Sequence, residues 1–438
     1  MGHARLSNAA RGLIQQRFVL VRRAALVTAF ALAAPALGCD GCRKDTPSGP
    51  VTVDAAPPPS PAPLDAEAPV DAGVVEDAAT AGDAAARLEL GDGGAACKLV
   101  WGPEEQPFHG PATLAVDGAT LLVVTNDSGR PRVRRVPVSP PAPPSKPTAA
   151  PSMSWPPCEI AGSVAYCHGR GSTVVRAPLE GAGGREVSTA AGNARLAAAQ
   201  LGKDHTVVAY VQRHQTTEGP MLQAFATLDE GEAVRLSDDG AGATSLRLVP
   251  LGPDRALAVY IDARTAMVPV HARTLSVEGG RLKLGEDVVV FVGGPPERGV
   301  DFTVARAGDK SLVLLPNAKD SLAFGMAAVA LAEPMREDMP AVWSMYPNGL
   351  DPAPIAATTE PSDSAYVARI RPLTRDPKSE RVLELGRVDA AGAYTSLGVV
   401  ETGKPVTDVD IAVDKTGAVW VVYGDTKTTW LGRWACPR

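Results

Sequence analysis

The six cysteines are the residues of this chain whose type and spacing most directly suggest chemistry. Cys39 and Cys42 have the gap of a redox or zinc half-site, and Cys158, Cys167 and His168 could form a metal-ligand set. No strand–helix pattern surrounds the first pair, and the eight residues between Cys158 and Cys167 suit neither a zinc knuckle nor a haem attachment motif. We therefore expect no metal and no cofactor, and we assign no role to Cys42.

The N-terminus has the order of an export signal: basic residues, an apolar run and small residues before a cysteine. Arg22-Arg23 is followed by the apolar run 24–34, which is about 11 residues long and too short to span a membrane as a helix. The segment resembles a bacterial lipoprotein signal peptide with Cys39 at the lipobox position, although Ala36 stands where that family usually carries leucine. The resemblance implies that residues 1–38 form a signal peptide and that Cys39 is lipidated.

A lipidated Cys39 would anchor the exported protein to the bacterial cell envelope, on the periplasmic face or the cell surface. An uncleaved transmembrane anchor is the alternative. Residues 39–96 then form a tether rich in Ala, Pro, Asp and Gly, in which ten carboxylates face three basic residues between 43 and 96. Such a composition cannot bury enough apolar surface to order the chain, so we expect a disordered spacer. Because the whole chain has a net charge of -6, the part that follows the tether is close to neutral and gives no support for nucleic-acid binding.

Two short segments carry side chains that could act on sugars. Ser237-Asp238-Asp239-Gly240 resembles a fragment of the Asp-box of sialidase-like propellers, with the glycine out of register and the tryptophan absent. In the segment 260–264, Asp262 and Arg264 stand where a loop following a strand could face a central funnel. The resemblance would require three arginines converging on a carboxylate, and Arg264, Arg298 and Arg369 can be nominated. Nothing around these residues singles them out, so we name none as catalytic.

A dense basic patch is formed by Arg130, Arg132, Arg134 and Arg135. In a strand, Arg132 and Arg134 would share one face, which could bind anionic glycans or lipid headgroups. A solvated strand edge is the simpler interpretation. We carry Asp262, Arg264, Arg132 and Arg134 forward as possible binding residues.

Short apolar runs bounded by Gly, Asp or Pro recur throughout residues 97–438 and indicate many short strands. The clearest unit is 411–423, with an apolar strand, a turn carrying Asp and Gly, and a second strand ending in an aromatic residue. Weaker copies precede it at intervals of 42 to 57 residues. The chain thus resembles seven-bladed β-propellers with four strands per blade, and 137–157 is a proline-rich insertion between the first two blades. A pair of β-sandwiches or a β-helix is the alternative.

The propeller resemblance accounts for the remaining cysteines. Only one strand can follow Tyr423 before Cys436, so the last blade would lack a strand unless 97–101 supplied it from the other end of the domain. This closure would bring Cys97 and Cys436 together, and Cys158 and Cys167 would form a second, local bridge.

These features together predict an exported, membrane-anchored lipoprotein whose propeller is a non-catalytic binding or scaffold module for an envelope protein or a glycan. A divergent sialidase-like glycoside hydrolase is the alternative function.

Overall fold

Over the residues that it describes, the computed structural model shows an all-β fold with 28 strands, which lie in the compact unit Ala79–Arg438. The structure describes residues 88–89, 96–139, 156–180, 183–189, 196–238, 242–262, 268–293, 302–316, 326–333, 335, 342–343, 354–360, 363–373, 380–400, 402, 406–425 and 427–437. The predicted signal peptide, Cys39 and Cys42 lie outside these residues.

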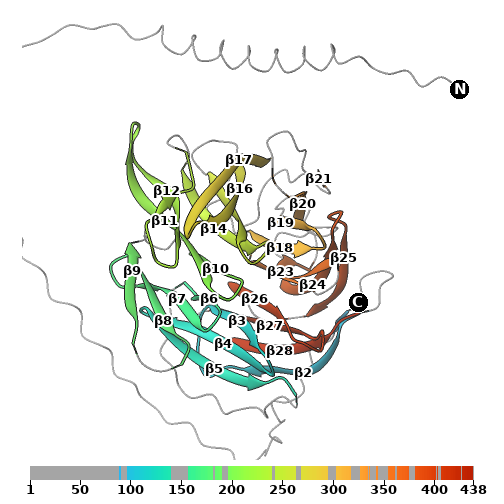
Figure 1. Ribbon diagram of the computed structural model, residues 1–438. Helices are drawn as coiled ribbons and strands as arrows, with labels where there is room; N and C mark the ends of the chain where they lie inside the picture. The colour runs from blue at the N-terminus through green and yellow to red at the C-terminus, as the bar shows by residue number, and fades with distance from the viewer. Residues whose placement is uncertain are drawn as a thin grey trace, which may run out of the picture. The chain divides into compact units, whose positions relative to one another are not determined.

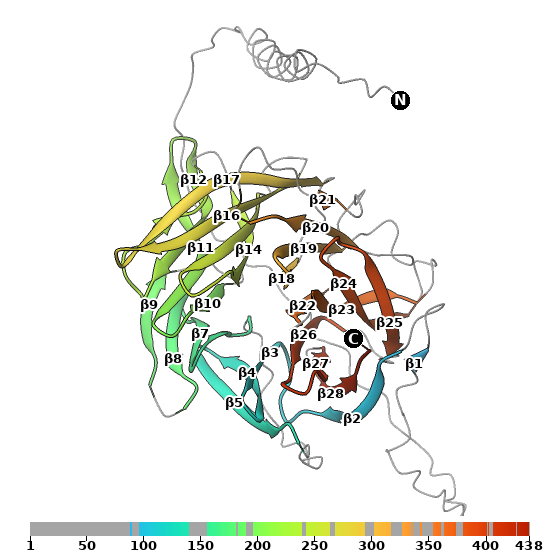
Figure 2. The same ribbon diagram turned by 45° about the vertical axis from the view of Figure 1, so that its right-hand side comes forward.

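The strands form seven antiparallel sheets, which we call blades 1 to 7, arranged in a ring (Figures 1 and 2). Blade 1 contains β3 (Ala112–Asp117), β4 (Thr120–Asp127) and β5 (Arg130–Pro137). Blade 2 contains β6 (Glu159–Ala161), β7 (Val164–Gly169), β8 (Thr173–Pro178) and β9 (Arg185–Thr189). Blade 3 contains β10 (Ala197–Leu201), β11 (His205–Thr216), β12 (Gly219–Leu228) and β13 (Val234–Arg235). Blade 4 contains β14 (Ala243–Pro250), β15 (Arg255–Asp262), β16 (Val268–Glu278) and β17 (Arg281–Gly293).

The remaining three blades complete the ring and confirm the predicted seven-bladed propeller. Blade 5 contains β18 (Thr303–Ala307), β19 (Lys310–Pro316), β20 (Met326–Leu331) and β21 (Val342–Trp343). Blade 6 contains β22 (Ile355–Thr359), β23 (Ser364–Pro372), β24 (Arg381–Asp389) and β25 (Tyr394–Val400), with β1 (Leu88–Glu89) paired to β25. Blade 7 contains β26 (Asp408–Val413), β27 (Val419–Gly424), β28 (Thr429–Ala435) and β2 (Lys98–Glu105).

The second strand of each blade explains the apolar runs of the sequence. β4, β15 and β27 are buried along almost their whole length, because each is covered on both faces by a neighbouring blade. Strands in such positions read as continuous apolar runs instead of alternating ones. Most residues of the outer strand β5 are instead exposed or partly buried, and Val136 is buried.

The hydrophobic core is divided among the contacts between blades. The described residues form seven apolar clusters, and each joins residues of two consecutive blades. The cluster of Trp420, Leu431, Leu121 and Val123 joins blade 7 to blade 1. On the inner strands, Asp410 Oδ2 accepts a hydrogen bond from Leu114 N at 2.7 Å across the same contact. The ring is therefore closed by packing as well as by strand pairing.

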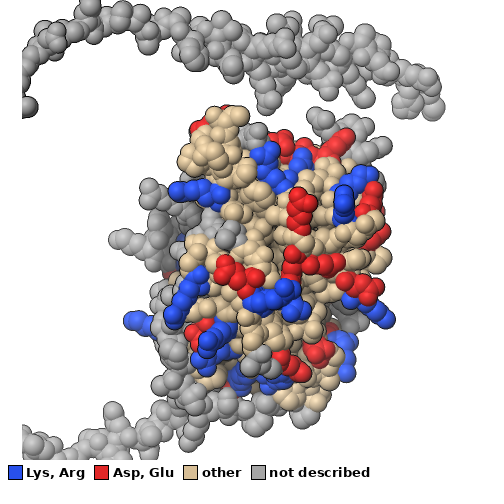
Figure 3. Space-filling view, turned by 60° about the vertical axis from the view of Figure 1, so that its left-hand side comes forward, with Lys and Arg blue, Asp and Glu red and all other residues tan. Residues whose placement is uncertain are grey.

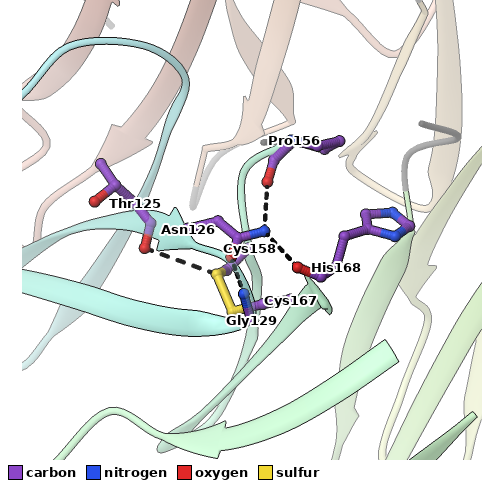
Figure 4. Close-up of a disulfide and its surroundings, with 7 residues drawn as sticks. All are labelled: Thr125, Asn126, Gly129, Pro156, Cys158, Cys167 and His168. Carbon is purple, nitrogen blue, oxygen red and sulfur yellow. Dashed lines mark hydrogen bonds between the residues drawn. A yellow bond between two sulfur atoms is a disulfide. The ribbon is translucent and has the colours of Figure 1, made fainter. Parts of the chain in front are cut away.

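The closure occurs as predicted, with the N-terminal strand completing the last blade. β2 pairs antiparallel with β28, and Figure 2 shows the blue strand β2 beside the red strand β28. A disulfide joins Cys97 to Cys436 next to this pairing, and a second disulfide joins Cys158 to Cys167 (Figure 4). Within the predicted tether, the structure pairs the backbone of Leu88–Glu89 with the outer edge of β25.

Blade 1 differs from the other blades because its sheet has three strands among the residues that the structure describes. The segment that follows β5 is the proline-rich 137–157, of which 140–155 lie outside the described residues.

Candidate binding groove

The residues with a possible catalytic role are held in structural contacts or lie outside the described residues. Asp262 ends β15 and is 4% exposed, and its Oδ1 accepts a hydrogen bond from Gly242 N at 3.0 Å. Ser237 Oγ accepts a hydrogen bond from Ala224 N at 3.1 Å, inside blade 3. Asp239, Arg264 and Arg298 are not described. The structure therefore does not bring the nominated arginines together on one described surface.

Arg369, the third nominated arginine, is buried inside blade 6. Its Nε donates to Glu384 Oε2 at 2.7 Å, and the two residues are 2% and 3% exposed. Burial would raise the pKa of Glu384, but the neighbouring Arg369 and Arg371 and a hydrogen bond from Ser396 outweigh it and hold the pKa below its usual value. The buried Glu384 carboxylate thus contacts Arg369 and Arg371 of β23 and Ser396 of β25. This cluster joins three strands of blade 6 and is not open to a substrate.

A second buried polar cluster ties the strands of blade 4. The Tyr260 hydroxyl donates to Asp287 Oδ2 at 2.6 Å, and His271 Nδ1 lies 3.3 Å from Asp287 Oδ1. The rings of Tyr260 and His271 stack with their centres 4.9 Å apart. Burial would raise the pKa of Asp287, but the hydrogen bonds from His271 and Tyr260 outweigh it and lower the pKa. Because Tyr260 is 0% exposed, this cluster also serves packing between strands.

The two arginines expected to share a face of one strand have different surroundings. Arg134 is drawn inward, where its Nη2 lies 2.9 Å from Glu104 Oε1 on β2 and its Nη1 contacts Gln106. Its side chain is 17% exposed. Arg132 is 63% exposed and pairs with Asp127 at 2.7 Å. Arg132 is thus accessible to a ligand, whereas Arg134 helps to hold blade 7 against blade 1.

A groove of about 820 Å³ runs between β5 of blade 1 and β8 of blade 2. One wall is β5 itself, and the other is formed by Val175 and Ala177 of β8 and by Gly183-Gly184. The groove lies beside β5, the third strand of blade 1. In the sheets of the other blades, a further strand pairs with the third one. The space therefore corresponds to the position of a fourth strand.

The charge of the groove is basic. Arg130, Arg132 and Arg135 line it, and Asp127 is the acidic residue among its lining. Arg132 is paired with Asp127, and Arg135 Nη2 donates to Glu180 Oε1 at 3.1 Å, a contact whose carboxylate is 85% exposed. Exposed ion pairs of this kind are weak, so both guanidinium groups can be redirected to a ligand at little cost.

Charge elsewhere on the visible surface is mixed. On the face drawn in Figure 3, Lys and Arg side chains are interspersed with Asp and Glu side chains, and neither sign dominates. This face therefore carries no general polyanion-binding surface.

One end of the groove is held by Asn126, a residue that sequence reasoning missed (Figure 4). Its Nδ2 donates to the carbonyl oxygens of Pro156 and His168, both at 3.0 Å, and its Oδ1 accepts from Gly129 N at 2.8 Å. The Cys158–Cys167 disulfide lies beside this junction. Together they fix the β4–β5 turn, which lines the groove, against the beginning of blade 2. The disulfide also occupies both thiols of the Cys158, Cys167 and His168 set considered above as metal ligands.

Among the residues described, no cluster of three or more His, Cys, Asp or Glu side chains is placed to hold a metal ion. The described part of the chain contains no helix long and apolar enough to cross a membrane.

No protein-family profile and no curated protein matches the sequence. Among solved structures, the chain is similar to a fungal lectin from Aleuria aurantia, described as a six-bladed β-propeller with a novel fucose recognition mode, at a TM-score of 0.35 and 10% identity over 64% of this chain and 93% of that chain. A point mutant of that lectin in complex with α-methyl-L-fucoside gives a TM-score of 0.37 and 14% identity over 70% and 98%. An α-L-arabinofuranosidase from Fusarium graminearum, a point mutant in complex with an iminosugar inhibitor, gives 0.35 and 12% over 75% and 93%. At these values the assignment of seven blades rests on the sheets of this chain itself.

Proposed function

We propose that this protein is an exported lipoprotein whose propeller is a binding module, with an anionic ligand held in the groove between blades 1 and 2. The observation that carries the proposal is the described lining of that groove, in which Arg130, Arg132 and Arg135 stand beside one acidic lining residue, Asp127. Guanidinium groups bind carboxylate, sulfate and phosphate groups through paired N–H donors. The ligand is therefore an acidic glycan or an acidic segment of an envelope protein.

The test is binding of a sulfated oligosaccharide and of an acidic peptide to the purified full-length protein. We expect binding that weakens as salt is raised and that falls about tenfold when Arg132 or Arg135 is replaced by alanine, because each loses a charge-assisted hydrogen bond. Arg281→Ala, at an exposed arginine of blade 4, is the matched control and should bind as the wild type does. Equal binding by all variants would refute the groove as the site.

Export and anchoring form the second part of the proposal. The support is the lipobox-like sequence before Cys39 and the two disulfides, because such bonds persist in oxidising compartments. Cys39→Ser should move the protein from the membrane fraction to the soluble fraction. Mass spectrometry of the mature N-terminus should find lipid on Cys39, and an unmodified cysteine there would refute the anchor.

No contact among the described residues favours the alternative of a glycoside hydrolase. A screen of glycan hydrolysis addresses it directly. We expect no turnover above background, whereas turnover abolished by Asp262→Ala would replace the binding module with an enzyme.

A further inference from the structure

The backbone groups on the outer edge of β5, which point away from β4, follow a defined pattern. Val138 N donates to Ala119 O at 2.9 Å, which places this residue pair among the hydrogen-bonded pairs of the β4–β5 ladder. In an antiparallel ladder, hydrogen-bonded and non-hydrogen-bonded pairs alternate. With the observed register, the even-numbered residues of β5 bond to β4, and the odd-numbered residues point their N–H and C=O groups away from it.

The prolines of β5 fit this pattern. Pro131 and Pro137 both have odd numbers, so neither interrupts the ladder to β4. Between them, Val133 and Arg135 direct their N–H and C=O groups into the groove, and no hydrogen bond joins these two N–H groups to a described residue. Such an edge can accept one more strand along a short central stretch, with proline closing both ends.

The two sides of the groove differ in chemistry. Val133 and Arg135 face blade 2, where Val175 and Ala177 supply small apolar surface. Arg132 lies on the opposite face of β5 and is exposed. A strand added to β5 would thus turn alternate side chains toward a small apolar wall and the others toward the exposed guanidinium groups.

We propose that an extended acidic segment of a partner protein adds to the outer edge of β5, which no described strand occupies, as the fourth strand of blade 1. This inference rests on the proposed function of the groove and assigns its ligand class. Backbone hydrogen bonds to Val133 and Arg135 hold the segment, and the arginines select acidic residues. The segment has small apolar and acidic residues in alternation and no proline at its centre.

The test uses a substitution that removes an edge N–H and no charge. Val133→Pro deletes the N–H of Val133, at a position of the same parity as the two natural prolines, so the ladder to β4 is kept. Val133→Ala is the matched control, since it loses side-chain packing and retains the N–H. The probe is a peptide of alternating valine and glutamate, as long as β5, titrated into the full-length protein in detergent.

We expect Val133→Pro to bind this peptide at least tenfold more weakly than Val133→Ala, and a peptide N-methylated on alternate backbone nitrogens to bind neither protein. Thermal unfolding of both variants shows whether each is folded. The Arg281→Ala variant again reports changes unrelated to the groove.

The outcomes separate the two proposals. Equal peptide binding by Val133→Pro and Val133→Ala would overturn strand addition. If a sulfated oligosaccharide binds and the peptide does not, strand addition is wrong and the anion-binding groove stands. If neither probe binds, both proposals fail. A dimer of the protein that dissociates in Val133→Pro would assign the edge to a second copy and overturn the partner segment.

Discussion

Asp414 is a buried carboxylate in the turn between β26 and β27, with an unusually full set of hydrogen bonds. Its Oδ1 accepts from the backbone N–H groups of Thr416 and Ala418, and its Oδ2 accepts from Trp420 Nε1 at 2.9 Å and Arg433 Nη2 at 2.8 Å. Arg433 also lies over the ring of Trp420, 5.4 Å from its centre. One side chain thereby joins three strands of blade 7.

We predict that Asp414→Ala lowers the free energy of unfolding by about 3–5 kcal/mol, because it leaves Arg433 buried without a counter-charge. The control is Asp389→Ala. Asp389 also caps a turn, accepting from Ala391 N and Ala393 N, but it is exposed and binds no cation among the described residues, so about 1 kcal/mol is expected. Urea denaturation measures both. Similar losses in the two variants would contradict the structural role of the buried ion pair.

Acid should destabilise the protein through its buried carboxylates. Burial would raise the pKa of Asp414, Glu384 and Asp287, but hydrogen bonds and charges lower each below its ordinary value, 3.8 for Asp and 4.5 for Glu. A group with a lowered folded-state pKa stabilises the fold above its unfolded pKa and loses that contribution as the pH falls through the folded pKa. We therefore expect the free energy of unfolding to decrease as the pH is lowered from about 4.5. Denaturation at a series of pH values measures this decrease. Asp414→Asn should show a shallower fall, and stability that rises with acid would refute the prediction.

The closing strand β2 depends on a glycine at an irregularity in its ladder. The register between β2 and β28 shifts on both sides of Trp101, and Gly102 follows with φ +81°. A Cβ at Gly102 would lie 2.6 Å from Leu431 O, a backbone atom that cannot move aside freely. The strand can approach β28 at this point only because the residue has no side chain.

We predict that Gly102→Ala costs about 3 kcal/mol or more, from the positive φ and the clash together. Gly118→Ala is the matched control, with φ +57° and nothing within 4 Å of its Cβ, and it should cost only about 1 kcal/mol. Hydrogen exchange along Lys98–Glu105 should accelerate in Gly102→Ala alone. Equal protection in both variants would show that β2 tolerates a side chain there.

At the scale of the whole molecule, the two disulfides constrain very different lengths of chain. Cys97 and Cys436 are 339 residues apart, and Cys158 and Cys167 are 9 apart. In the loop-entropy model, the first bond contributes about 6 kcal/mol and the second about 2–3 kcal/mol. We expect the Cys97→Ser/Cys436→Ser double variant to lose more stability in denaturation than Cys158→Ser/Cys167→Ser. An equal or reversed order would show that closure of the ring rests on packing and strand pairing alone.

Much of the architecture could be predicted from the sequence because it depends on local patterns. The middle strands of the blades read as apolar runs, as at Val419–Gly424, because neighbouring blades cover both of their faces. The period of these runs predicted the blade number, and the lone final strand before Cys436 predicted the closure by the N-terminal strand. The sequence predicted four strands for every blade, whereas the sheet of blade 1 has three among the residues that the structure describes.

The candidate site depended on contacts that no local pattern contains. Arg132 and Arg134 are two residues apart and are equivalent in the sequence pattern of β5. Only Arg134 forms an ion pair with Glu104, which lies on β2, the strand that completes blade 7. From the sequence, Asp262 stands where a loop could face a funnel, and in the structure its carboxylate accepts a hydrogen bond from Gly242 N at the start of the same blade.

The sequence by itself determined the repeat, the strand class and the composition of the segment before the propeller, because burial and turn chemistry act on neighbouring residues. The pairing of Cys97 with Cys436, 339 residues apart, followed only through the resemblance to a closed propeller. Only the tertiary structure decided which charges are buried, which are exposed, and that no described strand pairs with the outer edge of β5 beside a basic groove. These properties arise from residues brought together across the ring, such as Asp410 and Leu114, 296 positions apart. Their proximity follows from closure of the seven blades, which no single segment specifies.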